Sequence, residues 1–181
     1  MEKTREFLSE HNLTAAHLEA IGLVASEWAL LESELRVQMA AAVRLEKATW
    51  ITVLTRGAGG RELAEIYKGL IEWGALVEEQ GNALKPILEQ IIALAAERNK
   101  YVHAFWVMDI DSGESFFNFD GPKAEANAVS MTQQGRRFTP IKVGHEEIRA
   151  TARRIAEARG SLWKCLDATT QNKDKTTGDF A

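Results

Sequence analysis

The chain has 181 residues, close to the usual length of one globular domain. Hydrophobic residues make up 45% and charged residues 27%, and the single cysteine, Cys165, excludes an internal disulfide framework. The net charge of −4 argues against a protein that coats DNA. The first ten residues lack the apolar segment of a signal peptide and no apolar run is long enough to cross a bilayer, so we expect a cytoplasmic protein without membrane contact.

Helical periodicity dominates the first hundred residues. Apolar residues recur every three or four positions from residue 24 to residue 45, and Thr14 is the expected N-cap of this helix. A short helix is expected at 48–56, and the glycine cluster at 57–60 indicates a helix–helix connection. The next apolar stripe covers 63–77. A break is expected at Gly81-Asn82, followed by a third long helix with Pro86 in its first turn.

The period changes after residue 105. Residues 106–110 and 115–119 flank Asp111-Ser112-Gly113-Glu114, a pattern typical of a β-hairpin, and 129–133 with 138–143 are a second candidate. A last helix is expected from about His145 to Asp167. We therefore predict a mainly α fold, an antiparallel helical bundle with a small β-hairpin insertion (about 106–143) before the last helix. Residues 1–168 would form a single domain and residues 169–181 a flexible tail.

Charge is distributed unevenly along the chain. Residues 136–164 contain eight basic and three acidic residues, a net charge of +5, so the rest of the chain carries −9. Such a segment can form a local basic face on an acidic protein, and the alternative is an ordinary solvated helix surface.

The sequence lacks the residue patterns of several kinds of functional site. The glycine cluster has no Gly-Lys-Ser/Thr sequence after it, and the histidines His11, His17, His103 and His145 lack metal-ligand spacing. We expect no metal site and no cofactor. Cys165 lies near the apolar side of the last helix, which favours a packed thiol over a nucleophile, and the five tryptophans are expected mostly in the core.

One segment places an arginine on an apolar helical stripe. The third long helix ends with Arg98-Asn99-x-x-x-His103, with an apolar residue before the histidine and small Ala104 after it. This segment resembles the HEPN family, the higher-eukaryote and prokaryote nucleotide-binding helical domains. Their common pattern is an arginine, usually followed by a polar residue, and then a histidine after four to six intervening residues, near the end of a core helix. The resemblance covers residues 14–106 and 145–167.

The resemblance implies metal-independent RNA cleavage, with Arg98, Asn99 and His103 as catalytic residues. A histidine titrates near neutrality and can move the proton of a ribose 2′-hydroxyl, and an arginine fork stabilises charge that develops on a phosphate. Family members generally place two copies of the motif across a homodimer interface. A toxin or defence effector with a protein antitoxin as partner is the implied role. We expect Arg149 and Arg153 of the basic segment to hold RNA phosphates if they border the site.

Two other interpretations stay open at this point. The chain can be a non-catalytic helical dimer that binds a nucleotide or a protein partner in the same cleft. It can also use the motif for structure alone, with Arg98 bound to carboxylates of another helix and with Asn99 and His103 satisfying carbonyls at the helix end.

Overall fold

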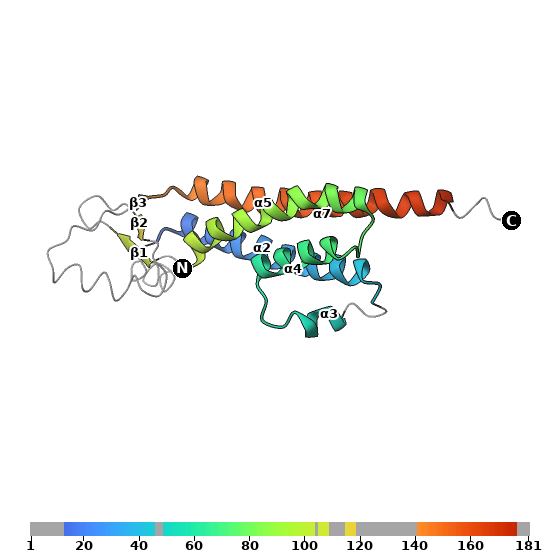
Figure 1. The fold of residues 1–181 in the computed structure, drawn as a ribbon. Helices are drawn as coiled ribbons and strands as arrows, with labels where there is room; N and C mark the ends of the chain where they lie inside the picture. Colours follow the sequence, from blue (N-terminus) through green and yellow to red (C-terminus); the bar gives the residue numbers. More distant parts are fainter. Residues whose placement is uncertain (1–12, 46–48, 104, 109–114, 119–140, 177–181) are drawn as a thin grey trace. The chain divides into compact units, whose positions relative to one another are not determined.

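The fold consists of helices with a small sheet. The computed structural model describes residues 13–45, 49–103, 105–108, 115–118 and 141–176. These residues form the helices α2 (Ala15–Ala42), α3 (Thr49–Leu54), α4 (Gly60–Glu72), α5 (Glu78–Val102) and α7 (His145–Thr176) (Figure 1). The predicted mainly α bundle is confirmed. No helix in this part of the chain is both long enough and apolar enough to span a membrane.

Three short strands lie between α5 and α7 in the sequence. They are β1 (Phe105–Met108), β2 (Ser115–Asn118) and β3 (Ile141–Lys142), and they form an antiparallel sheet in the order β1-β2-β3. Trp106 is opposite Phe117, and Phe117 is opposite Ile141 on its other side. The predicted turn 111–114 and most of the second predicted hairpin lie outside the described residues.

The chain divides into two compact units, where the sequence led us to expect one domain. Met1–Ala25 and Glu97–Ala152 form the first unit, and Ser26–Ala96 and Arg153–Ala181 form the second. Since α2, α5 and α7 each cross a boundary, each of them supplies a segment to both units.

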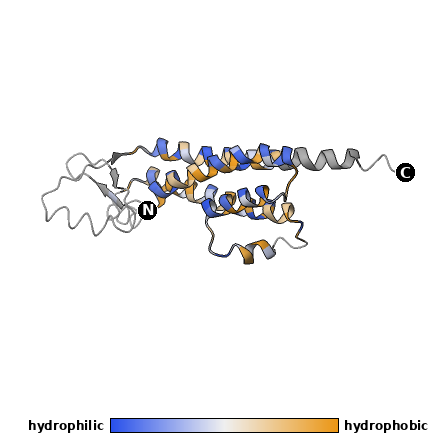
Figure 2. Cartoon of the chain, in the orientation of Figure 1, coloured by the Kyte–Doolittle hydropathy of each residue, from blue (hydrophilic) through white to orange (hydrophobic). Residues whose placement is uncertain are grey.

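The core of the second unit comes from α2, α4, α5 and α7. Figure 2 shows hydrophobic and hydrophilic residues on different faces of these helices, the pattern that buries one stripe per helix. α4 starts against the middle of α2 and runs in the same direction, because α3 and the glycine connection carry the chain back (Figure 1). α5 is antiparallel to α4. The fully buried side chains of this unit include Leu31, Leu35, Leu63, Tyr67, Leu84, Leu88, Ile91, Ile155 and Leu162.

The glycine cluster forms the connection between α3 and α4, as predicted. Gly57 has a φ of +85°, a left-handed conformation that favours glycine. Gly60 begins α4 against the Trp28 ring, where a Cβ would lie 2.5 Å from Cζ2. Its N–H donates to Glu32 Oε1 at 2.8 Å, so a carboxylate from α2 occupies the positive end of the α4 dipole.

The predicted break at Gly81-Asn82 is wrong. α5 begins at Glu78 and runs through Gly81, Asn82 and Pro86 to Val102. Gly81 is a packing residue, because a Cβ there would lie 2.6 Å from Ile71 Cγ2 on α4. The missing side chain lets the two helices approach closely, and this contact outweighs the low helix propensity of glycine.

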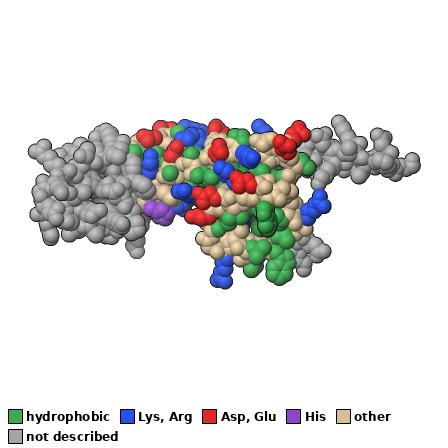
Figure 3. Space-filling model, viewed as in Figure 1, with side chains coloured by type: hydrophobic (Ala, Val, Ile, Leu, Met, Phe, Trp, Pro, Cys, Tyr) green, Lys and Arg blue, Asp and Glu red, His purple; other side chains and the backbone are tan. Residues whose placement is uncertain are grey.

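Two further expectations differ from the structure. α7 continues to Thr176, into the expected flexible tail, and residues 161–177 contain neither glycine nor proline to end it. Trp50, Trp73 and Trp163 are not core residues, with exposed fractions of 58%, 91% and 49%, whereas Trp28 is buried. Figure 3 shows hydrophobic side chains gathered at the surface around α3.

Candidate functional site

The Arg98 motif lies where α5 ends, in the first unit. The helix stops at Val102, and one further backbone hydrogen bond runs from the N–H of His103 to the carbonyl of Asn99 (3.2 Å). His103 is therefore held at the end of the helix although it follows the last helical residue.

The side chains of Arg98 and His103 meet. Arg98 Nη1 lies 2.7 Å from His103 Nε2 and donates to Asn99 Oδ1 at 3.0 Å. The two residues are about 140° apart around an ideal helix, so the length of the arginine side chain closes the gap within one chain. The guanidinium keeps its protons, so Nε2 accepts and we assign the imidazole as neutral with its hydrogen on Nδ1.

Asn99 contacts the arginine of the motif. Its carbonyl oxygen accepts from Arg98, so it orients the guanidinium, while the imidazole is oriented by Arg98 alone among the described residues. His103 and Asn99 are exposed and Arg98 is half-buried. A negatively charged group can therefore reach all three side chains from solvent.

Within the part of the chain that the structure describes, Arg98 is not used as a structural ion-pair partner. No carboxylate among the described residues forms an ion pair with it, and its Nε is buried without a hydrogen-bond partner in that part of the chain. An arginine held by two neutral acceptors keeps its full charge, which suits it to bind a phosphate or another anion.

Residues beside the motif fasten this end of α5 to α7. Tyr101 is buried, burial raises the pKa of its hydroxyl, and that hydroxyl donates to Glu147 Oε1 at 3.3 Å. Thr151 donates to Glu97 at 3.4 Å. The Nε1 of Trp106 donates to the Tyr101 carbonyl at 3.4 Å. These contacts hold the motif on a supported helix end, as a binding or catalytic site requires.

Comparisons with protein-family models, with curated proteins and with solved structures find no match. A functional conclusion for this chain therefore depends on the geometry of the site itself.

The two arginines expected to bind RNA have different surroundings. Arg149 donates to Glu19 at 2.9 Å and to Glu146 at 3.0 Å, so two carboxylates already balance its charge. Arg153 is exposed on α7 and belongs to the second unit. Within the described residues, neither forms a hydrogen bond to Arg98, Asn99 or His103.

Sequence reasoning missed the structural role of His17. Thr14 caps α2 as predicted, with its hydroxyl accepting from the backbone N–H of His17 (3.3 Å) and lying 2.7 Å from Nδ1 of the same residue. On the other side of the ring, Nε2 donates to the Val143 carbonyl at 3.1 Å. The His17 ring also packs edge-on against Trp106 and His145. The spacing of Thr14 and His17 was visible as a capping pattern, but Val143 is 126 residues away.

Proposed function

We propose that this chain is a metal-independent endoribonuclease of the HEPN type, with Arg98, Asn99 and His103 as its catalytic residues. The contact that supports the proposal most is the 2.7 Å approach of Arg98 Nη1 to His103 Nε2 on an exposed helix end. The guanidinium, which can bind a phosphate, and the neutral imidazole, which can accept a proton, therefore lie side by side. Cleavage of RNA by its own 2′-hydroxyl requires both groups at the same phosphate.

The Arg98–His103 hydrogen bond sets the order of events. It occupies the Nε2 lone pair in the free protein, so His103 cannot accept a proton until Arg98 moves. An RNA phosphate offers the guanidinium a charged, bidentate acceptor, which is stronger than a neutral imidazole nitrogen. Phosphate binding would therefore draw Arg98 away and free Nε2 in the same step.

The reaction then follows from ordinary chemistry. Nε2 takes the proton of the ribose 2′-hydroxyl, the 2′-oxygen forms a bond to phosphorus, and the bond to the 5′-oxygen breaks. The leaving oxygen takes a proton from water. Arg98 stabilises the additional negative charge on the phosphate oxygens. The products are a 2′,3′-cyclic phosphate and a 5′-hydroxyl end.

We include a homodimer and a role as a toxin or defence effector in this proposal. Both come from the family resemblance. A second copy of the motif beside the first would add another arginine to the same phosphate and would supply a second histidine as proton donor to the leaving oxygen.

The test is RNA cleavage by purified protein in the presence of EDTA, analysed for 2′,3′-cyclic phosphate ends. We expect His103→Ala to lower the rate at least a hundredfold, because a general base contributes about 10²–10⁴. Arg61→Ala on α4 is the matched surface control for Arg98→Ala, since among the described residues Arg61 pairs with the exposed Glu65 alone. Equal background cleavage by the wild type and His103→Ala would refute the proposal.

Asn99→Asp tests the order of events separately. A carboxylate 3.0 Å from Arg98 Nη1 would form an ion pair with the guanidinium and compete with the phosphate. We expect at least a tenfold slower cleavage from Asn99→Asp and a smaller effect from Asn99→Ala.

One observation favours the non-catalytic alternative, a helical dimer that binds a nucleotide or a protein partner. Among the described residues, His103 has a hydrogen-bond partner only at Nε2, and that nitrogen is already occupied by Arg98, an arrangement that also suits binding without chemistry. In that case RNA or nucleotide binding would fall in Arg98→Ala, while RNA stayed intact with every variant.

A further inference from the structure

A separate cavity lies entirely within the second unit. It is bounded by α2, α3 and the loop after α3, and its volume is about 450 Å³, within the range of small-molecule sites. Its lining includes Ser33, Arg36, Val37, Thr52, Thr55 and Arg56. These residues carry two positive charges and no negative charge, although the protein as a whole is acidic.

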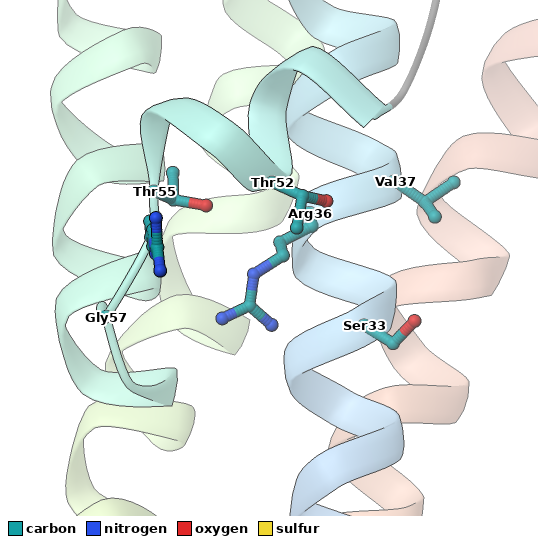
Figure 4. A pocket seen from close by; sticks show the side chains of 7 residues that line it. Ser33, Arg36, Val37, Thr52, Thr55 and Gly57 are labelled. Carbon is teal, nitrogen blue, oxygen red and sulfur yellow. The ribbon is translucent and has the colours of Figure 1, made fainter.

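Arg36 is held in place at the cavity. Its Nη2 donates to the backbone carbonyl of Ala58 at 2.9 Å, and Figure 4 shows its guanidinium reaching from α2 into the space beside the loop at Gly57. A guanidinium has five N–H donors, and this is its one hydrogen bond among the described residues. An arginine fixed at one nitrogen and half-buried loses little further freedom when it binds an anion.

The hydroxyl groups of the lining differ in what they can donate. The Thr55 hydroxyl donates to the Ile51 carbonyl of α3 at 2.7 Å, so its proton is already used in the protein. Ser33 and Thr52 are exposed and supply hydroxyls that can rotate toward a ligand. Val37, with 48% of its surface exposed, adds an apolar wall.

We propose that this cavity binds a small organic molecule with a phosphate or carboxylate group on an apolar body. Arg36 and Arg56 hold the anionic group, the Ser33 and Thr52 hydroxyls donate to it, and Val37 contacts the body. The cavity is several times larger than a phosphate ion, so the ion alone would leave most of it unfilled. The inference is independent of RNA cleavage, because all of these residues belong to the second unit and the Arg98 motif belongs to the first.

Phenyl phosphate is the probe for this site, titrated into the full-length protein by calorimetry at low salt. We expect saturable binding at one site per chain, weaker binding of inorganic phosphate, and no binding of benzyl alcohol. A parallel titration with benzoate decides between phosphate and carboxylate as the preferred group.

Four variants locate the binding. Arg36→Met and Arg56→Met should each weaken phenyl phosphate at least tenfold, and Arg61→Met, a solvent-exposed arginine on α4, should change it less than twofold. Binding should persist in Arg98→Met, which separates this cavity from the RNA site. Because Arg36 also supports the loop through Ala58, thermal melting checks that Arg36→Met folds. Arg56 is exposed, so Arg56→Met tests the binding with a substitution that leaves this loop contact intact. Non-saturable binding, binding unchanged in both Arg36→Met and Arg56→Met, or inorganic phosphate binding as tightly as phenyl phosphate would overturn the proposal.

Discussion

Two buried tyrosines differ in whether their hydroxyl groups are hydrogen-bonded. Tyr67 on α4 is fully buried, and its hydroxyl has no hydrogen-bond partner among the described residues. Tyr101 on α5 is also buried, but its hydroxyl donates to Glu147. An unpartnered buried hydroxyl costs about 1–3 kcal/mol, whereas a made hydrogen bond stabilises by about 1 kcal/mol.

The two Tyr→Phe changes should therefore have opposite signs. We expect Tyr67→Phe to raise the free energy of unfolding by about 1 kcal/mol and Tyr101→Phe to lower it by about 1 kcal/mol. Urea unfolding at neutral pH measures both. A loss of stability in Tyr67→Phe would show that its hydroxyl is hydrogen-bonded in solution.

The raised pKa of Tyr67 makes the stability of the protein depend on pH in the alkaline range. Burial raises the pKa of Tyr67 from 10.0 to about 12, so between these values the folded protein holds a proton that the unfolded chain releases. The contribution of this pKa difference to the free energy of unfolding is complete below pH 10 and is lost as the pH rises toward 12. The alkaline decline should be shallower in Tyr67→Phe.

Sequence spacing singled out the residues of the candidate site but not the contacts that hold them. Arg98, Asn99 and His103 are close together in the sequence, so their contact at a helix end could be predicted from their spacing. Tyr101–Glu147 and Arg149–Glu19 join residues 46 and 130 positions apart. No periodicity within one helix reports which carboxylate of another helix it meets.

At the level of helices, glycine has two different roles in α4 and α5. Gly81 on α5 is pressed against Ile71, while Gly69 on α4 is exposed and a Cβ there meets nothing within 4 Å. Both are in helices, so alanine would gain about 0.5–1 kcal/mol of backbone propensity at either position. Only at Gly81 does the new methyl group collide with a neighbour.

Gly69→Ala and Gly81→Ala should accordingly separate in thermal melting. We expect Gly69→Ala to stabilise by about 0.5–1 kcal/mol, and Gly81→Ala to destabilise by about 1–2 kcal/mol after overpacking is set against the propensity gain. If both changes stabilised the protein, the close approach of α4 and α5 at Gly81 would be refuted.

Gly81 also shows why some helix boundaries could be predicted from the sequence and others could not. Apolar periodicity correctly predicted the course of α2 and the start of α7, because it samples many residues. The prediction from glycine as a helix breaker failed at the start of α5, where a glycine that favours a turn locally is required by a contact with another helix.

At the scale of the whole molecule, the basic segment is partly neutralised. Arg149 pairs with Glu19 and Glu146, and Arg159 pairs with Glu27, so α2 supplies carboxylates to two of the arginines in the +5 segment. The charge asymmetry seen in the sequence therefore overstates the charge that is free to meet a polyanion.

This neutralisation predicts a shallow salt dependence for the proposed RNA binding. Each phosphate contact with a single strand contributes about −0.7 to the slope of log K against log salt concentration, so a few contacts give a slope of roughly −2 to −3. Fluorescence anisotropy at several salt concentrations measures the slope, with the His103→Ala protein that the proposed mechanism leaves without a general base. A value steeper than about −5 would mean that the whole basic segment contacts RNA.

The pairing of α2 with α7 has a consequence for the order of folding. Glu27 and Arg159 meet across 132 positions, whereas the α4–α5 contact between Lys68 and Glu89 spans 21. Distant pairs close late because loop closure costs entropy, so α4 and α5 would pair early and α7 last. At a ribosome speed of about 5–20 residues per second, α2 would wait roughly 7–26 seconds for α7 to be synthesised. Throughout this interval the growing chain carries α2 without the arginines of α7 that pair with Glu19 and Glu27.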